Sequence, residues 1–103
     1  MEKHIERHLV QAVKRLGGTA YKFSSPSHRG VSDRVVCLPG QTWFVELKQA
    51  SGKLSPLQKL FAEDMKRLGQ NYACLWSKED VDKWISDLTK KPAQISSSSA
   101  TEP

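Results

Sequence analysis

The sequence predicts an α/β domain in which a mixed β-sheet is flanked by helices, with elements in the order α-β-β-β-α-β-α. Three stretches carry apolar residues at helical spacing, and four shorter runs are rich in β-branched and aromatic residues. A turn signal joins the second and third of these runs, and a helical stretch separates the third from the fourth. The chain of 103 residues is long enough for one such domain with a modest core.

The first helix is expected over residues 2–16, because apolar residues recur there at helical spacing. These residues are Ile5, Leu9, Val13 and Leu16. Basic residues in its last turn favour the helix dipole, and Gly17 ends it. A short strand over residues 19–23 and a polar loop over residues 24–30 are expected to follow.

Residues 31–38 and 41–49 are predicted to pair as an antiparallel hairpin, because the turn-forming residues Pro39-Gly40 connect them. Alternate side chains of a strand point to the same face of a sheet. In the second strand one face therefore carries Phe44, Glu46 and Lys48, and the other Trp43, Val45 and Leu47.

The second half of the chain predicts a crossover. Ser55-Pro56-Leu57-Gln58 has the residues of a capping box with proline at the first helical position, so a helix begins there. The apolar strand over residues 72–76 follows that helix and is expected to lie parallel to the preceding strand. A last helix begins after Ser77. The Ser-rich residues 92–103 predict a disordered tail, which leaves residues 1–91 as the domain.

The charge is distributed unevenly along the chain. The net charge is +5, and residues 1–59 hold ten Lys or Arg against four Asp or Glu, whereas residues 60–91 hold six of each. A basic region around a few carboxylates suits a polyanion such as nucleic acid. The alternative is a charge that serves solubility alone.

Other classes of protein receive less support. No apolar run approaches the roughly 20 residues that span a bilayer, and the N-terminus lacks the apolar stretch of a secretory signal, so we expect a cytoplasmic protein with no membrane partner. Cys37 and Cys74 fall in apolar runs and are expected to be reduced core residues. They are too isolated to indicate a zinc site, which needs about four ligands.

The chemistry-bearing residues fall on the predicted hairpin. Asp33 lies where a loop becomes a strand, and Glu46 and Lys48 share one face of the neighbouring strand. Two close carboxylates repel each other unless a cation compensates them. Asp33, Glu46 and the backbone carbonyl of Leu47 offer the oxygen ligands that Mg²⁺ prefers, and Lys48 is placed to meet a phosphate or a water. The rival interpretation is a surface hairpin with solvated charges.

Three segments in this order resemble the VRR-Nuc family of the PD-(D/E)XK nuclease superfamily. They are Gly30-Val31-Ser32-Asp33, Phe44-Val45-Glu46-Leu47-Lys48 and Gly52-Lys53-Leu54-Ser55-Pro56-Leu57-Gln58. The similarity runs from about residue 5 to residue 85 and implies a restriction-endonuclease-like fold. The length is similar to that of the stand-alone phage or bacterial form, which implies a protein that acts in the cytoplasm of a bacterial host.

The resemblance also implies roles for individual residues. Asp33 and Glu46 match the two metal-binding acids, and Lys48 matches the catalytic lysine. Gln58 matches a glutamine that supports the site, and Glu6 resembles an acidic residue of the first helix that joins the metal shell directly or through water. The implied cofactor is Mg²⁺, or Mn²⁺ in its place.

Some of these assignments have alternatives. Gln58 is also the expected capping partner of Ser55, and Glu2 competes with Glu6 for the metal shell. The family favours proline where this chain has Ser32. The basic residues expected near the DNA path are Lys22, Arg29, Arg34 and Lys53.

The sequence and the resemblance together favour a metal-dependent DNA endonuclease. Stand-alone members of the family are similar to Holliday-junction resolvases, which implies branched DNA as the substrate and a homodimer, since two coordinated cuts require two copies of one site. The alternatives are a non-catalytic nucleic-acid-binding module on the same fold, and a nuclease that acts on flaps or on specific duplex sites.

Overall fold

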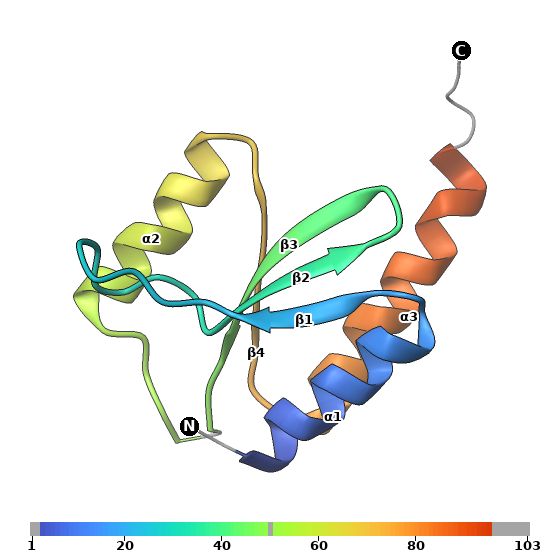
Figure 1. The fold of residues 1–103 in the computed structure, drawn as a ribbon, viewed down its shortest axis with the longest axis horizontal. Helices are drawn as coiled ribbons and strands as arrows, with labels where there is room; N and C mark the ends of the chain where they lie inside the picture. The colour runs from blue at the N-terminus through green and yellow to red at the C-terminus, as the bar shows by residue number, and fades with distance from the viewer. Residues whose placement is uncertain (1–2, 50, 96–103) are drawn as a thin grey trace.

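The computed structural model describes residues 3–49 and 51–95. It contains α1 (Lys3–Arg15), β1 (Thr19–Lys22), β2 (Arg34–Leu38), β3 (Gln41–Leu47), α2 (Pro56–Arg67), β4 (Asn71–Leu75) and α3 (Lys78–Ile95). This order is the one predicted. The sheet lies between α2 on one side and the pair α1 and α3 on the other (Figure 1).

The four strands form one mixed sheet in the order β1-β2-β3-β4. The pairs β1–β2 and β2–β3 are antiparallel, and β3–β4 is parallel. The predicted hairpin and the predicted crossover through α2 are therefore both confirmed. Because the turn between β2 and β3 is short, it fixes the register of the two strands, with Val36 opposite Trp43.

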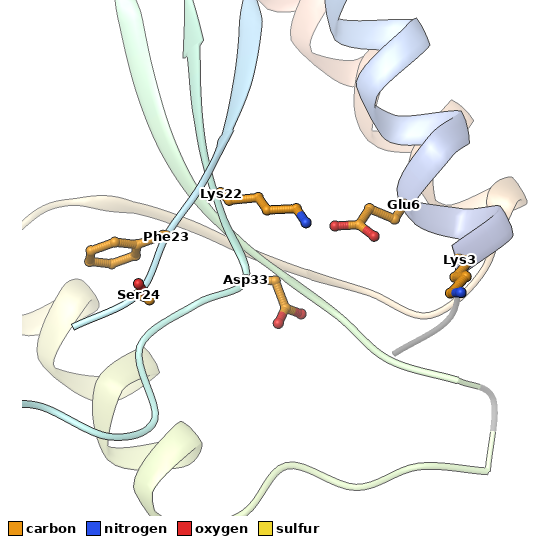
Figure 2. A pocket seen from close by; sticks show the side chains of 6 residues that line it. All are labelled: Lys3, Glu6, Lys22, Phe23, Ser24 and Asp33. Carbon is orange, nitrogen blue, oxygen red and sulfur yellow. The ribbon is translucent and has the colours of Figure 1, made fainter. Parts of the chain in front are cut away.

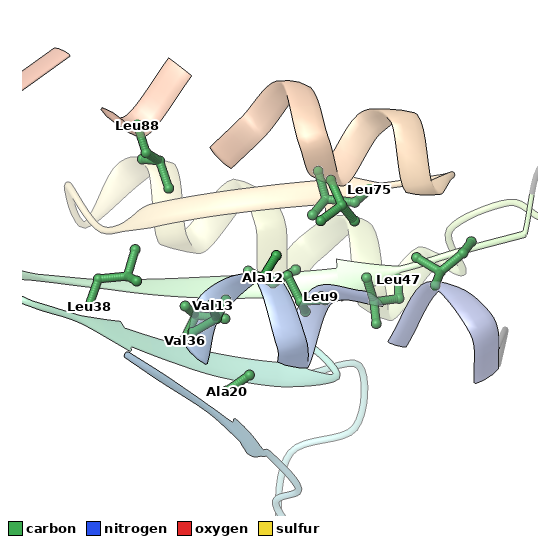
Figure 3. Close-up of a cluster of buried hydrophobic side chains, with 12 residues drawn as sticks. Leu9, Ala12, Val13, Ala20, Val36, Leu38, Leu47, Leu75 and Leu88 are labelled. Atoms are coloured by element: carbon green, nitrogen blue, oxygen red, sulfur yellow. The ribbon is translucent and has the colours of Figure 1, made fainter. Parts of the chain in front are cut away.

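The main core fills the space between the sheet and the helices α1 and α3 (Figure 3). Leu9 and Val13 of α1 are fully buried against Val36 and Val45 of the central strands, and Val81 closes the layer from α3. These side chains alternate along the strands and recur at helical spacing, so the apolar pattern of the sequence accounts for this face.

The opposite face of the sheet is covered by α2 through aromatic side chains. Phe61 of α2 contacts Phe23, Phe44 and Tyr72, with ring centroids 5.8 to 6.3 Å apart. None of the residues of α2, all of which the structure describes, is buried. Leu57 and Leu60 of α2 and its C-cap residue Leu68 are exposed.

Three boundaries differ from the expectation by more than one residue. The hairpin strands are shorter than predicted, because β2 begins at Arg34 and β3 ends at Leu47. At this end of the ladder the Leu47 N–H donates to the Asp33 carboxylate instead of a backbone carbonyl, so regular pairing stops. Helix α3 continues to Ile95, past the predicted start of the tail at residue 92.

The extension of α3 has a local reason. The residues that follow Pro92 include Ala and Gln, which have high helix propensity, and proline disfavours but does not forbid a helix. The rest of the predicted tail, residues 96–103, lies outside the described residues. No helix in the described part of the chain is long and apolar enough to cross a membrane.

Candidate active site

The hairpin register brings the two predicted acids together. Arg34 pairs with Val45 across β2 and β3, so the next position places Asp33 opposite Glu46. The Asp33 carboxylate accepts a hydrogen bond from the Leu47 N–H at 2.8 Å, and the Asp33 carbonyl accepts one from Phe23 N at 3.0 Å. These contacts hold the residue at the point where the ladder ends.

Glu46 is buried, with 2% of its surface exposed. Burial, followed by the negative charge of Asp33, raises the pKa of its carboxyl from 4.5 to about 7, against an opposing contribution from Lys48. The Lys48 Nζ lies 3.7 Å from Glu46 Oε2. Burial also raises the pKa of the neighbouring Cys74 thiol to about 11, so this group stays protonated and is a poor nucleophile at neutral pH.

The capping box of α2 orients Gln58 toward Glu46. The Gln58 N–H donates to Ser55 Oγ at 3.1 Å, and Gln58 Oε1 accepts from the Ser55 N–H at 2.8 Å. With its oxygen engaged there, the amide directs Nε2 to Glu46 Oε2 at 3.1 Å. The two interpretations of Gln58 therefore hold together, since its cap contacts fix the hydrogen bond that it gives to the buried carboxylate.

The loop that carries Asp33 packs directly on the first turn of α2. Gly30 has a φ of +86°, and a Cβ at this position would lie 2.6 Å from backbone atoms of Leu57. Only glycine permits both the left-handed backbone and this close approach. The buried Ser32, which stands where the family favours proline, donates from Oγ to the Arg34 carbonyl at 3.2 Å.

A cavity of about 470 Å³ opens beside Asp33. Its lining residues are Lys3, Glu6, Lys22, Phe23, Ser24 and Asp33 (Figure 2). The sequence did not indicate Lys3 or Ser24, although Lys3 lies one helical turn before Glu6 and thus shares its face. A second cavity of about 240 Å³ is lined by Lys48 with Leu47, Gln49 and Gly52.

The four basic residues that were expected near DNA differ in their exposure to solvent. Lys22, Arg29 and Lys53 are exposed. Arg34 is not, because its side chain is 11% exposed and its guanidinium pairs with Glu6 at 2.6 Å. Glu2, the alternative to Glu6, lies outside the described residues.

No family model matches the chain. A solved structure titled "VRR_NUC domain" is similar to it with a TM-score of 0.79 and 32% identity, over 82% of this chain and 94% of that one. The chain belongs to the VRR-Nuc family. The resemblance drawn from its motifs and the restriction-endonuclease-like α/β fold that this resemblance implied are therefore confirmed.

This VRR-Nuc chain is also similar to a phage protein. A protein of Acyrthosiphon pisum secondary endosymbiont phage 1, named "Putative nuclease p44", is 53% identical over 58 residues. The match covers 55% of this chain and 62% of the phage protein, so the VRR-Nuc chain spans less than two thirds of that relative.

The donor set of the VRR-Nuc site fits a hard cation. Among the described residues no group of three His, Cys, Asp or Glu side chains is close enough to hold a metal ion. Mg²⁺, however, is usually bound through one or two carboxylates together with substrate phosphates and waters. The buried Glu46 beside Asp33, with its raised pKa, is a carboxylate pair whose charge a divalent cation would balance.

Proposed function

We propose that this VRR-Nuc chain is a divalent-metal-dependent endonuclease that hydrolyses DNA phosphodiester bonds. The observation that carries the proposal is the buried Glu46 carboxylate, which faces Asp33 and lies 3.7 Å from the Lys48 amine. A buried acid of raised pKa at the end of a sheet costs stability, and such costs are typical of functional sites. The similar phage protein, by its name a nuclease, supports the same conclusion.

In this proposal Asp33, Glu46 and the Leu47 carbonyl would hold Mg²⁺ or Mn²⁺, and Glu6 would join the metal shell directly or through water. The cation would lower the pKa of a water and balance the charge that develops on the phosphate. Lys48 donates to the scissile phosphate or to the attacking water. Gln58 keeps Glu46 Oε2 oriented through its 3.1 Å hydrogen bond.

The proposed substrate is branched DNA, such as a four-way junction, in the cytoplasm of a bacterial host. We expect the exposed Lys22, Arg29 and Lys53 to contact phosphates, and such contacts position a protein on DNA without reading sequence. Symmetric cleavage of a junction needs two copies of this single site, so we propose a homodimer. Gel filtration that returns a monomer of 11.6 kDa with DNA present would contradict the dimer.

The function is tested with supercoiled plasmid, linear, flapped and four-way-junction DNA in Mg²⁺ or Mn²⁺. The wild type is expected to cleave, with the junction preferred. Glu46→Gln and Lys48→Ala should each lower the cleavage rate at least about 100-fold, because each removes a group that acts on the reacting atoms. Glu63→Gln, at an exposed acid of α2, is the matched control and should cleave like the wild type.

Circular dichroism of each variant separates lost chemistry from lost folding. A wild type that is as inert as both variants, yet shifts DNA on a gel, would identify a binding module without cleavage. A wild type that cuts flaps or one duplex site in preference to junctions would support the proposed cleavage reaction but contradict the proposed substrate.

A further inference from the structure

Arg34 follows Asp33 in the sequence but points to the opposite face of the sheet. Its backbone pairs with Val45, whose side chain lies in the core between the sheet and α1 and α3. Asp33, one residue earlier, faces Glu46 on the side of α2. The two neighbours therefore point to opposite faces of the sheet, although Asp33 was expected at the metal site and Arg34 near the DNA path.

The Arg34 guanidinium joins three elements. Its Nη1 donates to the Ala20 carbonyl of β1 at 2.7 Å, and its Nε and Nη2 donate to Glu6 Oε2 of α1 at 3.0 and 2.6 Å. The side chains of Arg34 and Glu6 are 11% and 18% exposed. An ion pair so far removed from water is costly to break, since either partner would be left as an uncompensated charge.

The ion pair uses one Glu6 oxygen, Oε2. Arg34 Nε and Nη2 both donate to this oxygen. Glu6 lines the same cavity of about 470 Å³ as Asp33, and Figure 2 shows both carboxylates among the lining side chains. Arg34 thus determines where the Glu6 carboxylate lies relative to Asp33.

We propose that Arg34 is a positioning residue that holds Glu6 at the cavity wall for the metal shell, and that it is not a DNA contact. This proposal rests on the proposed metal-dependent function. A phosphate contact needs an accessible cation with free donors, whereas the Arg34 guanidinium is committed to α1 and β1. Lys22, which lines the same cavity and is exposed, has the accessibility that Arg34 lacks.

The test compares Arg34→Gln with Lys22→Gln as its matched control, because each removes one positive charge. Mn²⁺ alone is titrated into each protein by calorimetry. DNA binding is measured without divalent cations as a function of salt. Arg34→Gln is expected to weaken Mn²⁺ binding roughly 10-fold, as is usual for residues that orient a metal site. Its salt dependence should match the wild type, whereas Lys22→Gln should lower the salt slope by about 0.9.

A second pair of variants tests whether Arg34 acts through Glu6. Glu6→Gln should weaken Mn²⁺ binding, and adding Arg34→Gln to it should cause no further loss, since coupled residues are not additive. Arg34→Lys keeps the charge but not the three hydrogen bonds, so it should also bind Mn²⁺ weakly. It replaces Arg34→Gln if that variant does not fold.

The outcomes separate this proposal from the function on which it rests. An Arg34→Gln protein with a lower salt slope and wild-type Mn²⁺ affinity would make Arg34 a DNA contact. A variant that loses thermal stability but neither property would make its role structural alone. Either result overturns the positioning role. A wild type that binds no Mn²⁺ overturns the metal-dependent function itself.

Discussion

The two faces of the sheet are built differently. Toward α1 and α3 the buried core is aliphatic, with the partly buried Trp43 and Trp84 packed against it, and Leu9, Val36 and Val81 have no exposed surface. Toward α2 the contacts are aromatic, no residue of α2 is buried among those described, and Leu60 is 55% exposed. The first face is a closed core, and the second is a partial cover.

Asp33 and Glu46 lie on the second face, where polar partners can reach their carboxylates. Glu46 is the one charged residue that is buried in the described part of the chain, and it receives hydrogen bonding from the cap of α2. The fully buried aliphatic layer around Leu9 and Val36 offers no such partner. The difference teaches that the closed face supplies stability, while the more open face carries the destabilising pair of Asp33 and Glu46.

The largest expected effect compares the same truncation on the two faces. Leu9→Ala should lower the free energy of unfolding by about 2–5 kcal/mol, because it leaves a cavity in a closed layer. Leu60→Ala should change it by less than about 0.5 kcal/mol, because the side chain is half exposed and alanine favours the helix. Chemical denaturation measures both. Equal losses would show that α2 is packed as tightly as α1.

A smaller effect is expected where the loop that carries Asp33 meets α2. Gly30→Ala should cost roughly 2–4 kcal/mol, because the residue has a positive φ and its new Cβ would meet the Leu57 backbone at 2.6 Å. Gly40→Ala is the control, since its φ is +79° but nothing lies within 4 Å of the added atom. It should cost only about 1 kcal/mol. If thermal unfolding shows equal costs, the close approach is unimportant.

The order of elements, the hairpin and the parallel crossover were predictable, because alternation, turn residues and the capping box are local signals. The meeting of Asp33 and Glu46 was predictable for the same reason, since a tight turn fixes the register between its strands. Gln58 was harder to assign, because its cap contacts are local but its hydrogen bond to Glu46 spans two elements.

Contacts that depend on how a helix docks were not predictable. The pairing of Arg34 with Glu6 requires α1 to lie across the end of β1 and β2, and nothing in the local sequence fixes that position. For the same reason Lys3 and Ser24 emerged as lining residues only from the three-dimensional cavity. Positive charge alone does not distinguish an arginine that binds DNA from one that pairs with an acidic side chain of a neighbouring helix.

The smallest effect in this series concerns Glu46 and Asp33 on the α2 side of the sheet. In metal-free buffer above pH 7, Glu46→Gln should stabilise the protein by roughly 1–3 kcal/mol, because it removes a buried charge beside Asp33. The folded-state pKa of Glu46 is raised to about 7 from 4.5, so the folded protein retains a proton that the unfolded chain has lost. Stability is therefore full below about pH 4.5 and falls as pH rises through 7, and the gain from Glu46→Gln should vanish at the acidic end.

Thermal unfolding from pH 4 to pH 8 in the presence of EDTA measures this gain, with Glu63→Gln on exposed α2 as the control that should show none. Added Mn²⁺ should reverse the order above pH 7, because the cation stabilises only the protein that retains the carboxylate pair. A Glu46→Gln protein that is less stable than the wild type at pH 8 without metal would mean that Lys48 and Gln58 already compensate the charge. The Asp33–Glu46 pair on the α2 side of the sheet would then not lower the stability of the protein.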